Sequence, residues 1–162
     1  MNIIYLINSK EYNYHKKVAE DFVSVTGGSV IDMGDGTNLG ARFYEINGKR
    51  PDVIITFDLA GHVLRTGNNT LSLNNIYARF AHILFHKTDH YGRDLKARQN
   101  LSMFTYVPNG ADIEAVRTAY PEAPNIEEFV PFAYKPADDK ERDSNAENLR
   151  RWWDDFRKEA ML

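Results

Sequence analysis

The feature that most constrains the fold is an apolar run, Val53 to Phe57, which Pro51 and Asp52 precede and Asp58 closes. A strand with one face in water alternates apolar and polar residues, whereas a strand covered on both faces stays apolar throughout. The segment 52–58 is therefore predicted to be a central strand of a parallel sheet, with helices packed on both of its faces.

Similar runs and helical patterns alternate along the rest of the chain. Apolar runs at 2–7, 82–86 and 101–107, with a shorter one at 29–33, predict further strands. Apolar residues at helical spacing occur at 13–26, 39–46 and 112–119. This order predicts an α/β fold, a three-layer Rossmann-like sandwich with a mostly parallel sheet.

Three features add to this core. Residues 63–65 and 70–73 flank a Thr-Gly-Asn-Asn turn, which predicts a small β-hairpin excursion. The apolar segment 125–134 contains Pro131, so we expect an edge strand or an extended crossing segment there. A charged connector, 135–143, precedes a capping box at 144–147 and an amphipathic C-terminal helix. We interpret residues 1–162 as one domain, with 138–162 as a connector and a helix that packs on the body.

Composition excludes several classes of function. The 20 basic and 23 acidic residues are interspersed and give a net charge of -3, which argues against nucleic acid and anionic membranes as partners. The absence of cysteine excludes thiol nucleophiles, cysteine-ligated zinc and disulfides. The N-terminus is apolar for only one strand's length, which fits neither a signal peptide nor a membrane span, so we expect a cytoplasmic protein.

The candidate site follows from the fold. In open parallel sheets, ligands bind outside the carboxyl ends of the strands, near the point where strand order reverses. The segment after the 52–58 strand is the richest in chemistry, because a carboxylate, a glycine, an imidazole and a guanidinium follow one another there. We assign possible catalytic roles to Asp58 and His62, either of which could orient or deprotonate a hydroxyl. The predicted ligand-binding residues are Asn8, Tyr12, His15, Gly61, Arg65, Arg79 and His86. The alternative is that Asp58 only caps the turn that follows its strand.

Two other patterns argue against a metal or a nucleotide cofactor. His82, His86 and His90 repeat every fourth residue, but on a strand His82 and His86 would stand about 13 Å apart, too far to share a metal. The glycine-rich segment 34–40 breaks the spacing of a dinucleotide-binding loop and contains Asp35, which would repel a pyrophosphate. We expect neither a metal nor a cofactor.

The element order resembles that of a known family. A first strand with a histidine-bearing helix, PDVIITFD closing in a glycine turn, and then HILFH and FTYVPNG are similar to the N-terminal lobe of GT-B glycosyltransferases. The resemblance covers residues 1–135 and implies a Rossmann-like lobe that binds an acceptor. Because 162 residues leave no room for a donor lobe, it also implies that a transferase would need a partner chain.

Two classes of function remain open. The first is a module that binds a small molecule, either a sugar or a nucleotide, and is related to a glycosyltransferase acceptor domain. The second is a non-catalytic interaction domain that uses the hairpin or the C-terminal helix to contact a partner chain or a second copy. The two differ in whether Asp58, His62 and His86 converge on one place, and the sequence does not decide whether the chain is an enzyme.

Overall fold

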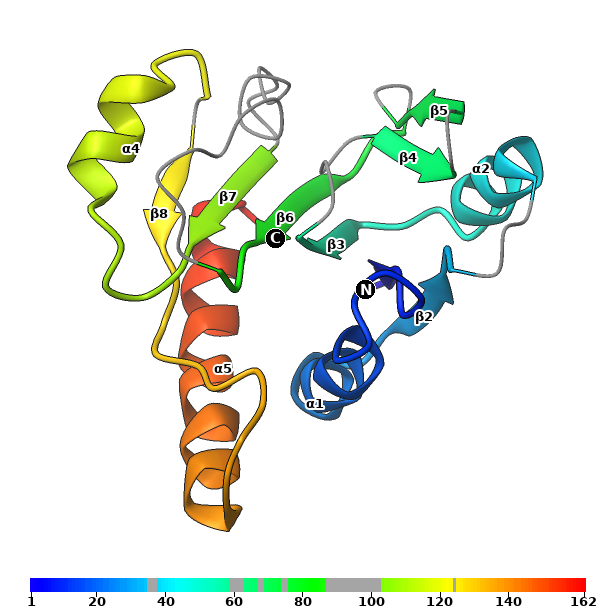
Figure 1. Cartoon of the computed structure of the whole chain (residues 1–162). Helices are drawn as coiled ribbons and strands as arrows, with labels where there is room; N and C mark the ends of the chain where they lie inside the picture. Colours follow the sequence, from blue (N-terminus) through cyan, green and yellow to red (C-terminus); the bar gives the residue numbers. More distant parts are fainter. Residues whose placement is uncertain (35–37, 59–62, 67–68, 74–75, 87–102, 124) are drawn as a thin grey trace.

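The computed structural model describes residues 1–34, 38–58, 63–66, 69–73, 76–86, 103–123 and 125–162 (Figure 1). Its centre is a six-stranded sheet in the order β2-β1-β3-β6-β7-β8, in which every neighbouring pair is parallel. The strands are β1 (Ile3–Ile7), β2 (Ser29–Asp32), β3 (Val53–Phe57), β6 (Arg79–Ile83), β7 (Met103–Val107) and β8 (Ile126–Glu128). All five residues of β3 are buried. The central strand predicted from the apolar run is therefore confirmed.

Helices lie on both faces of the sheet, as the Rossmann-like sandwich requires. They are α1 (His15–Thr26), α2 (Leu39–Gly48), α4 (Ile113–Ala119) and α5 (Asp139–Glu159). One face packs against α1 and α5 through an aromatic core that includes Tyr5, Phe22 and Phe57. The other face carries Ile4, Leu6 and Ile54 in a core with α2, and a further core joins β7 and β8 to α4. The α/β prediction is confirmed.

The strand order reverses between β1 and β3. From β1 the chain moves outward to β2 through α1, and it then returns past β1 to β3 through α2 (Figure 1). Such a reversal leaves a crevice between the carboxyl ends of the two strands, which is where open α/β sheets bind ligands. In this chain those ends are followed by Asn8 and Asp58.

The predicted hairpin and edge strand are both present. β4 (Val63–Thr66) pairs antiparallel with β5 (Asn69–Ser72) in a separate two-stranded sheet. Among the described residues β8 pairs with β7 alone and ends the sheet, so the first part of the Pro131 segment is an edge strand. β6 begins three residues earlier than the predicted strand at 82–86, so His86 lies beyond its carboxyl end.

The C-terminal helix begins earlier than its sequence suggested. The side chain of Asp138 accepts a hydrogen bond from the Glu141 backbone N–H, and α5 starts at Asp139. Glu141 in turn accepts from the Ala137 N–H, so these residues cap the helix before the predicted box at 144–147. The charged connector is in part the first turn of the helix. Leu149, Trp152, Trp153 and Phe156 are buried in the α1 face of the sheet, so the chain itself covers the apolar stripe.

None of the helices in the described part of the chain has both the length and the apolar composition that crossing a membrane requires.

Candidate site at the carboxyl edge of the sheet

Asp58 joins the carboxyl ends of two central strands. Its backbone N–H donates to the Ile83 carbonyl at 3.0 Å, and its Oδ1 accepts from the Phe85 N–H at 3.0 Å. These bonds extend the contact of β3 with β6 beyond the last paired residues. Asp58 has a φ of 52°, in the left-handed region that costs most side chains energy but that aspartate tolerates better than most. This backbone turns the carboxylate inward, where its side chain is only 7% exposed.

His15, the first residue of α1, bridges the residues that follow β1 and β3. Its side chain is completely buried, and its Nε2 lies 3.1 Å from Asp58 Oδ2. The Asn8 N–H donates to its Nδ1 at 3.4 Å. Because Nδ1 accepts, a ring proton is on Nε2, and His15 donates it to Asp58. Tyr12 stacks on the His15 ring at 4.5 Å between centroids, which holds the imidazole in place.

Tyr14 connects the buried carboxylate to an exposed histidine. Its hydroxyl lies 2.5 Å from Asp58 Oδ2 and 2.7 Å from His86 Nε2. An ionised carboxylate only accepts, so the phenol donates to Asp58 and accepts from the His86 Nε2–H. Burial, followed by the hydrogen bond and charge of Asp58, raises the pKa of Tyr14 above its ordinary value. Tyr14 therefore keeps its proton at neutral pH.

Two residues from the segment before α5 complete the group. The Tyr134 ring lies 4.8 Å from the Tyr14 ring and 5.1 Å from the His86 ring. The Lys135 Nζ lies 5.6 Å from the Tyr14 centroid and 5.8 Å from the Tyr134 centroid, within the range of a cation–π contact. We call the assembled residues the carboxyl-edge cluster: Asn8, Tyr12, Tyr14, His15, Asp58, His86, Tyr134 and Lys135.

The arrangement gives Asp58 and His86 different chemical capacities. Asp58 receives three donors, from Tyr14, His15 and Phe85, so its oxygens hold protein groups in place. His86 is exposed and uses Nε2 to bond Tyr14, which leaves Nδ1 as the nitrogen that a ligand can reach. The Asp58–Tyr14 pair fixes the tautomer of His86 in the way that a buried acid orients a catalytic imidazole.

The structure brings together five of the nine predicted site residues, namely Asn8, Tyr12, His15, Asp58 and His86. It places Arg79 at the opposite edge, where β6 begins and where its Nε donates to the Ala160 carbonyl at 2.9 Å. Gly61 and His62 lie outside the described residues. Only the backbone of Arg65, on β4, is described.

Sequence reasoning missed Tyr14, Tyr134 and Lys135. Tyr14 fits the apolar pattern of α1, and only its position beside His15 at the helix start hints at another role. Tyr134 and Lys135 lie about fifty positions beyond His86, where the predicted edge segment meets the charged connector and the structure has neither helix nor strand. No local pattern connects them to the strand ends.

No group of three or more histidine, aspartate or glutamate residues in the described part of the chain is arranged to hold a metal ion. Of the three histidines spaced four residues apart, His82 is buried within β6 and His86 is exposed beyond the end of that strand. His90 lies outside the described residues.

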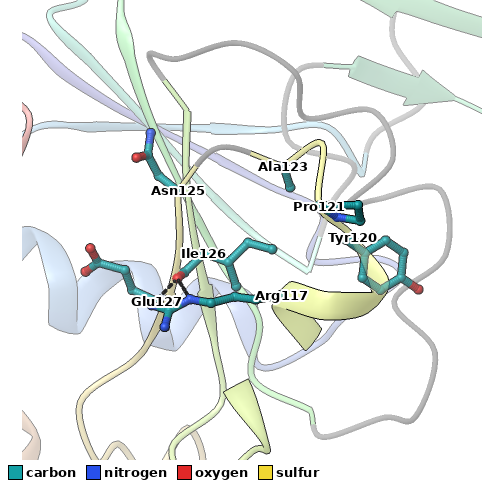
Figure 2. Close-up of a pocket in the computed structure, with 7 residues that line it drawn as sticks. All are labelled: Arg117, Tyr120, Pro121, Ala123, Asn125, Ile126 and Glu127. Atoms are coloured by element: carbon teal, nitrogen blue, oxygen red, sulfur yellow. Dashed lines mark hydrogen bonds between the residues drawn. The ribbon is translucent and has the colours of Figure 1, made fainter. Parts of the chain in front are cut away.

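A separate cavity of about 310 Å³ lies at the other end of the sheet, between α4 and β8 (Figure 2). Its lining residues are Arg117, Tyr120, Pro121, Ala123, Asn125, Ile126 and Glu127. Arg117 donates from Nε and Nη2 to the Ile126 carbonyl at 3.0 and 2.8 Å, as the dashed lines show. The guanidinium therefore caps a backbone acceptor of the edge strand.

Burial and the neighbouring Glu159 carboxyl raise the pKa of Glu127 to about 7. This glutamate thus holds a proton near neutral pH, beside an arginine whose donors are already engaged by backbone and Glu114.

Comparison with known proteins adds no family assignment. No family model, curated protein or solved structure matches this chain.

Proposed function

We propose that this chain binds a small hydroxyl-bearing ligand, a sugar or a nucleotide, at the carboxyl-edge cluster. The observation that carries the proposal is the chain of hydrogen bonds from buried Asp58 through Tyr14 to exposed His86. It orients an imidazole at the edge of the sheet where open parallel folds bind ligands.

The buried part of the cluster supports this assignment. Burying a carboxylate and a histidine costs free energy that an apolar pair would not, and the partners of Asp58 only offset that cost. Here Asp58 and His15 lie at the strand-order reversal. Through Tyr14, Asp58 also orients the ring of His86, which is exposed to solvent. An arrangement that served stability alone would not need to extend to His86.

The aromatic rings support a ligand with an extended face. Tyr12, Tyr14 and Tyr134 meet at this edge, and sugars and bases both pack on aromatic side chains. In the proposed complex, His86 Nδ1 accepts a hydrogen bond from a ligand hydroxyl. If that hydroxyl reacts, His86 is the group that takes its proton, while Asp58 acts through Tyr14 as a positioning residue.

The finer form of the proposal is that the chain is an acceptor-binding module related to GT-B glycosyltransferases. Its support is the parallel α/β architecture and the order of its elements. On this proposal the acceptor hydroxyl faces His86.

A thermal-shift screen with matched variants tests the proposal. The panel contains simple sugars, nucleosides and their phosphorylated forms, because a ligand that binds only the folded state raises the melting temperature. Tyr14→Phe keeps the ring but breaks the link between Asp58 and His86, and His86→Ala removes the imidazole. Tyr44→Phe, on the exposed face of α2, is the same chemical change away from the site.

We expect at least one sugar or nucleotide to stabilise the natural chain and Tyr44→Phe equally. Tyr14→Phe and His86→Ala should lose most of that shift, since one hydrogen bond to an oriented group is worth about 1 kcal/mol or more. Equal shifts in all four proteins, or none with any ligand, would contradict a site at this edge.

A further inference from the structure

A positive charge stands over the aromatic part of the carboxyl-edge cluster. The Lys135 ammonium lies within 6 Å of the centroids of both Tyr14 and Tyr134, and the His86 ring contacts the same two rings at 5.7 and 5.1 Å. A lysine on a flexible stem normally extends into water. Here the rings of Tyr14 and Tyr134, from two segments far apart in the sequence, both lie beside its charge.

The acids of the site do not neutralise this charge. Asp58 is the carboxylate within the cluster, and its two oxygens already accept from three protein donors. Glu11, in the loop after β1, accepts from the side chain of Asn8 at 3.3 Å. Among the described residues, Lys135 has no carboxylate within ion-pair distance.

Because no described carboxylate pairs with Lys135, its ammonium can contact an anion. An ammonium offers three donors as a compact point charge, the form in which lysine binds phosphate. The His86 ring contacts the same two tyrosine rings, so it lies beside an anion that Lys135 holds. The Tyr14 phenol, whose raised pKa keeps it protonated, adds no negative charge beside them.

We propose that the ligand of the carboxyl-edge cluster carries a phosphate group, which Lys135 holds beside the His86 ring and the two tyrosine rings. This rests on the proposed function and narrows its ligand class to sugar phosphates and nucleotides. Neutral sugars and nucleosides pack on the same Tyr14 and Tyr134 rings but lack the contact between Lys135 and a phosphate.

Matched ligand pairs separate the phosphate from the rest of the ligand. Calorimetric titration of the whole chain at low salt would compare glucose with glucose 6-phosphate and adenosine with AMP, with inorganic phosphate as the arm that lacks a sugar or base. The variants are Lys135→Met, which keeps the apolar stem, and Lys135→Arg, which keeps the charge. Lys158→Met is the control, because Lys158 is exposed on the last turn of α5, near the opposite edge of the sheet. All four proteins should fold alike, since both lysines are exposed.

The expected result is that one phosphorylated ligand binds roughly tenfold or more tightly than its neutral partner, the preference of a charge-assisted hydrogen bond. Lys135→Met should remove most of this preference and leave the neutral ligand unaffected, whereas Lys135→Arg and Lys158→Met should keep it. Added salt should weaken the binding of the phosphorylated ligand and leave the binding of its neutral partner unchanged.

The other outcomes separate the two proposals. Equal binding of neutral and phosphorylated partners, or a preference that survives in Lys135→Met, overturns the phosphate assignment and leaves the proposed function standing. Binding of inorganic phosphate as tight as that of the best ligand shows that the site does not recognise a sugar or base. Failure of the whole panel to bind overturns both.

Discussion

Replacing Glu127 with glutamine should stabilise this protein at alkaline pH and leave it nearly unchanged at pH 5. Glu127 lies on β8, opposite Tyr106 of β7 and beside Glu159 on the last turn of α5. Burial raises its pKa from 4.5 to about 7, and the hydrogen bond and charge of Glu159 add to the effect. The groups that face it are Glu159, Asp155 and Tyr106, with Arg117 opposing the shift.

The sign follows from proton linkage. A carboxyl whose pKa is higher in the folded state binds its proton more tightly there, so the free energy of unfolding falls as the pH rises from about 4.5 through about 7. At about 1.4 kcal/mol per pKa unit, the full shift would correspond to roughly 3 kcal/mol. Because the Glu127 side chain is half-buried and partly screened by water, we expect a loss of about 1–2 kcal/mol.

Urea denaturation at pH 5, 6, 7 and 8 measures this loss. Relative to the natural chain, Glu127→Gln should gain stability progressively from about pH 5 to about pH 7 and level off above it. Glu159→Gln should reproduce only part of the gain, since burial is the larger cause of the shift. Glu147→Gln, on the exposed face of α5, serves as the control and should show no such trend. A difference between Glu127→Gln and the natural chain that stays constant from pH 5 to pH 8 would refute the reasoning.

Two further substitutions test the fold around the sites. Asp58→Asn places an amide where the Tyr14 hydroxyl and the His15 Nε2–H need an acceptor. The free energy of unfolding measured in urea should therefore fall by about 2–3 kcal/mol. An unchanged urea midpoint would mean that these hydrogen bonds contribute nothing to stability. Arg117→Met leaves the Ile126 carbonyl of the edge strand without its donor, so the free energy of unfolding should fall by about 1 kcal/mol. The exposed edge should also promote self-association, seen by light scattering as a mass that rises with protein concentration. A variant that keeps the mass of the natural chain would show that the guanidinium does not protect the edge.

The sheet could be predicted because its signals are local. The apolar residues of β1, β3 and β7 identify buried parallel strands wherever they pair, and the helical spacing in α1 and α5 identifies the face that packs inward. The start of α5 was missed because Asp138 and Ser144 both head plausible capping motifs, and tertiary context rather than the motif decides between them.

Part of the site could be predicted for a different reason. Parallel strands bring their carboxyl ends to one edge, so Asn8, Asp58 and His86 were expected together once three strands were known. Arg79 was misplaced in this picture because β6 begins at that residue, which puts it at the amino end of the strand. Tyr134 and Lys135 reach the site from a segment without regular structure, and their position depends on how α5 packs against α1.

Residues whose backbone conformation, burial or helix capping is unfavourable lie together at the carboxyl edge of the sheet. This is the strongest physical reason to place function there. Asp58 adopts a left-handed backbone, His15 is buried as a polar ring, and α1 begins without a side-chain cap. An ordinary turn at Asp58, an apolar side chain at position 15 and a capping serine before α1 would each make the fold more stable. Local strain persists only where the surrounding structure holds it, and functional sites are where it concentrates. In this chain the strained and buried groups all connect, through Tyr14, to the exposed imidazole of His86. A substitution that relieved them without changing the fold should therefore raise stability and weaken ligand binding together.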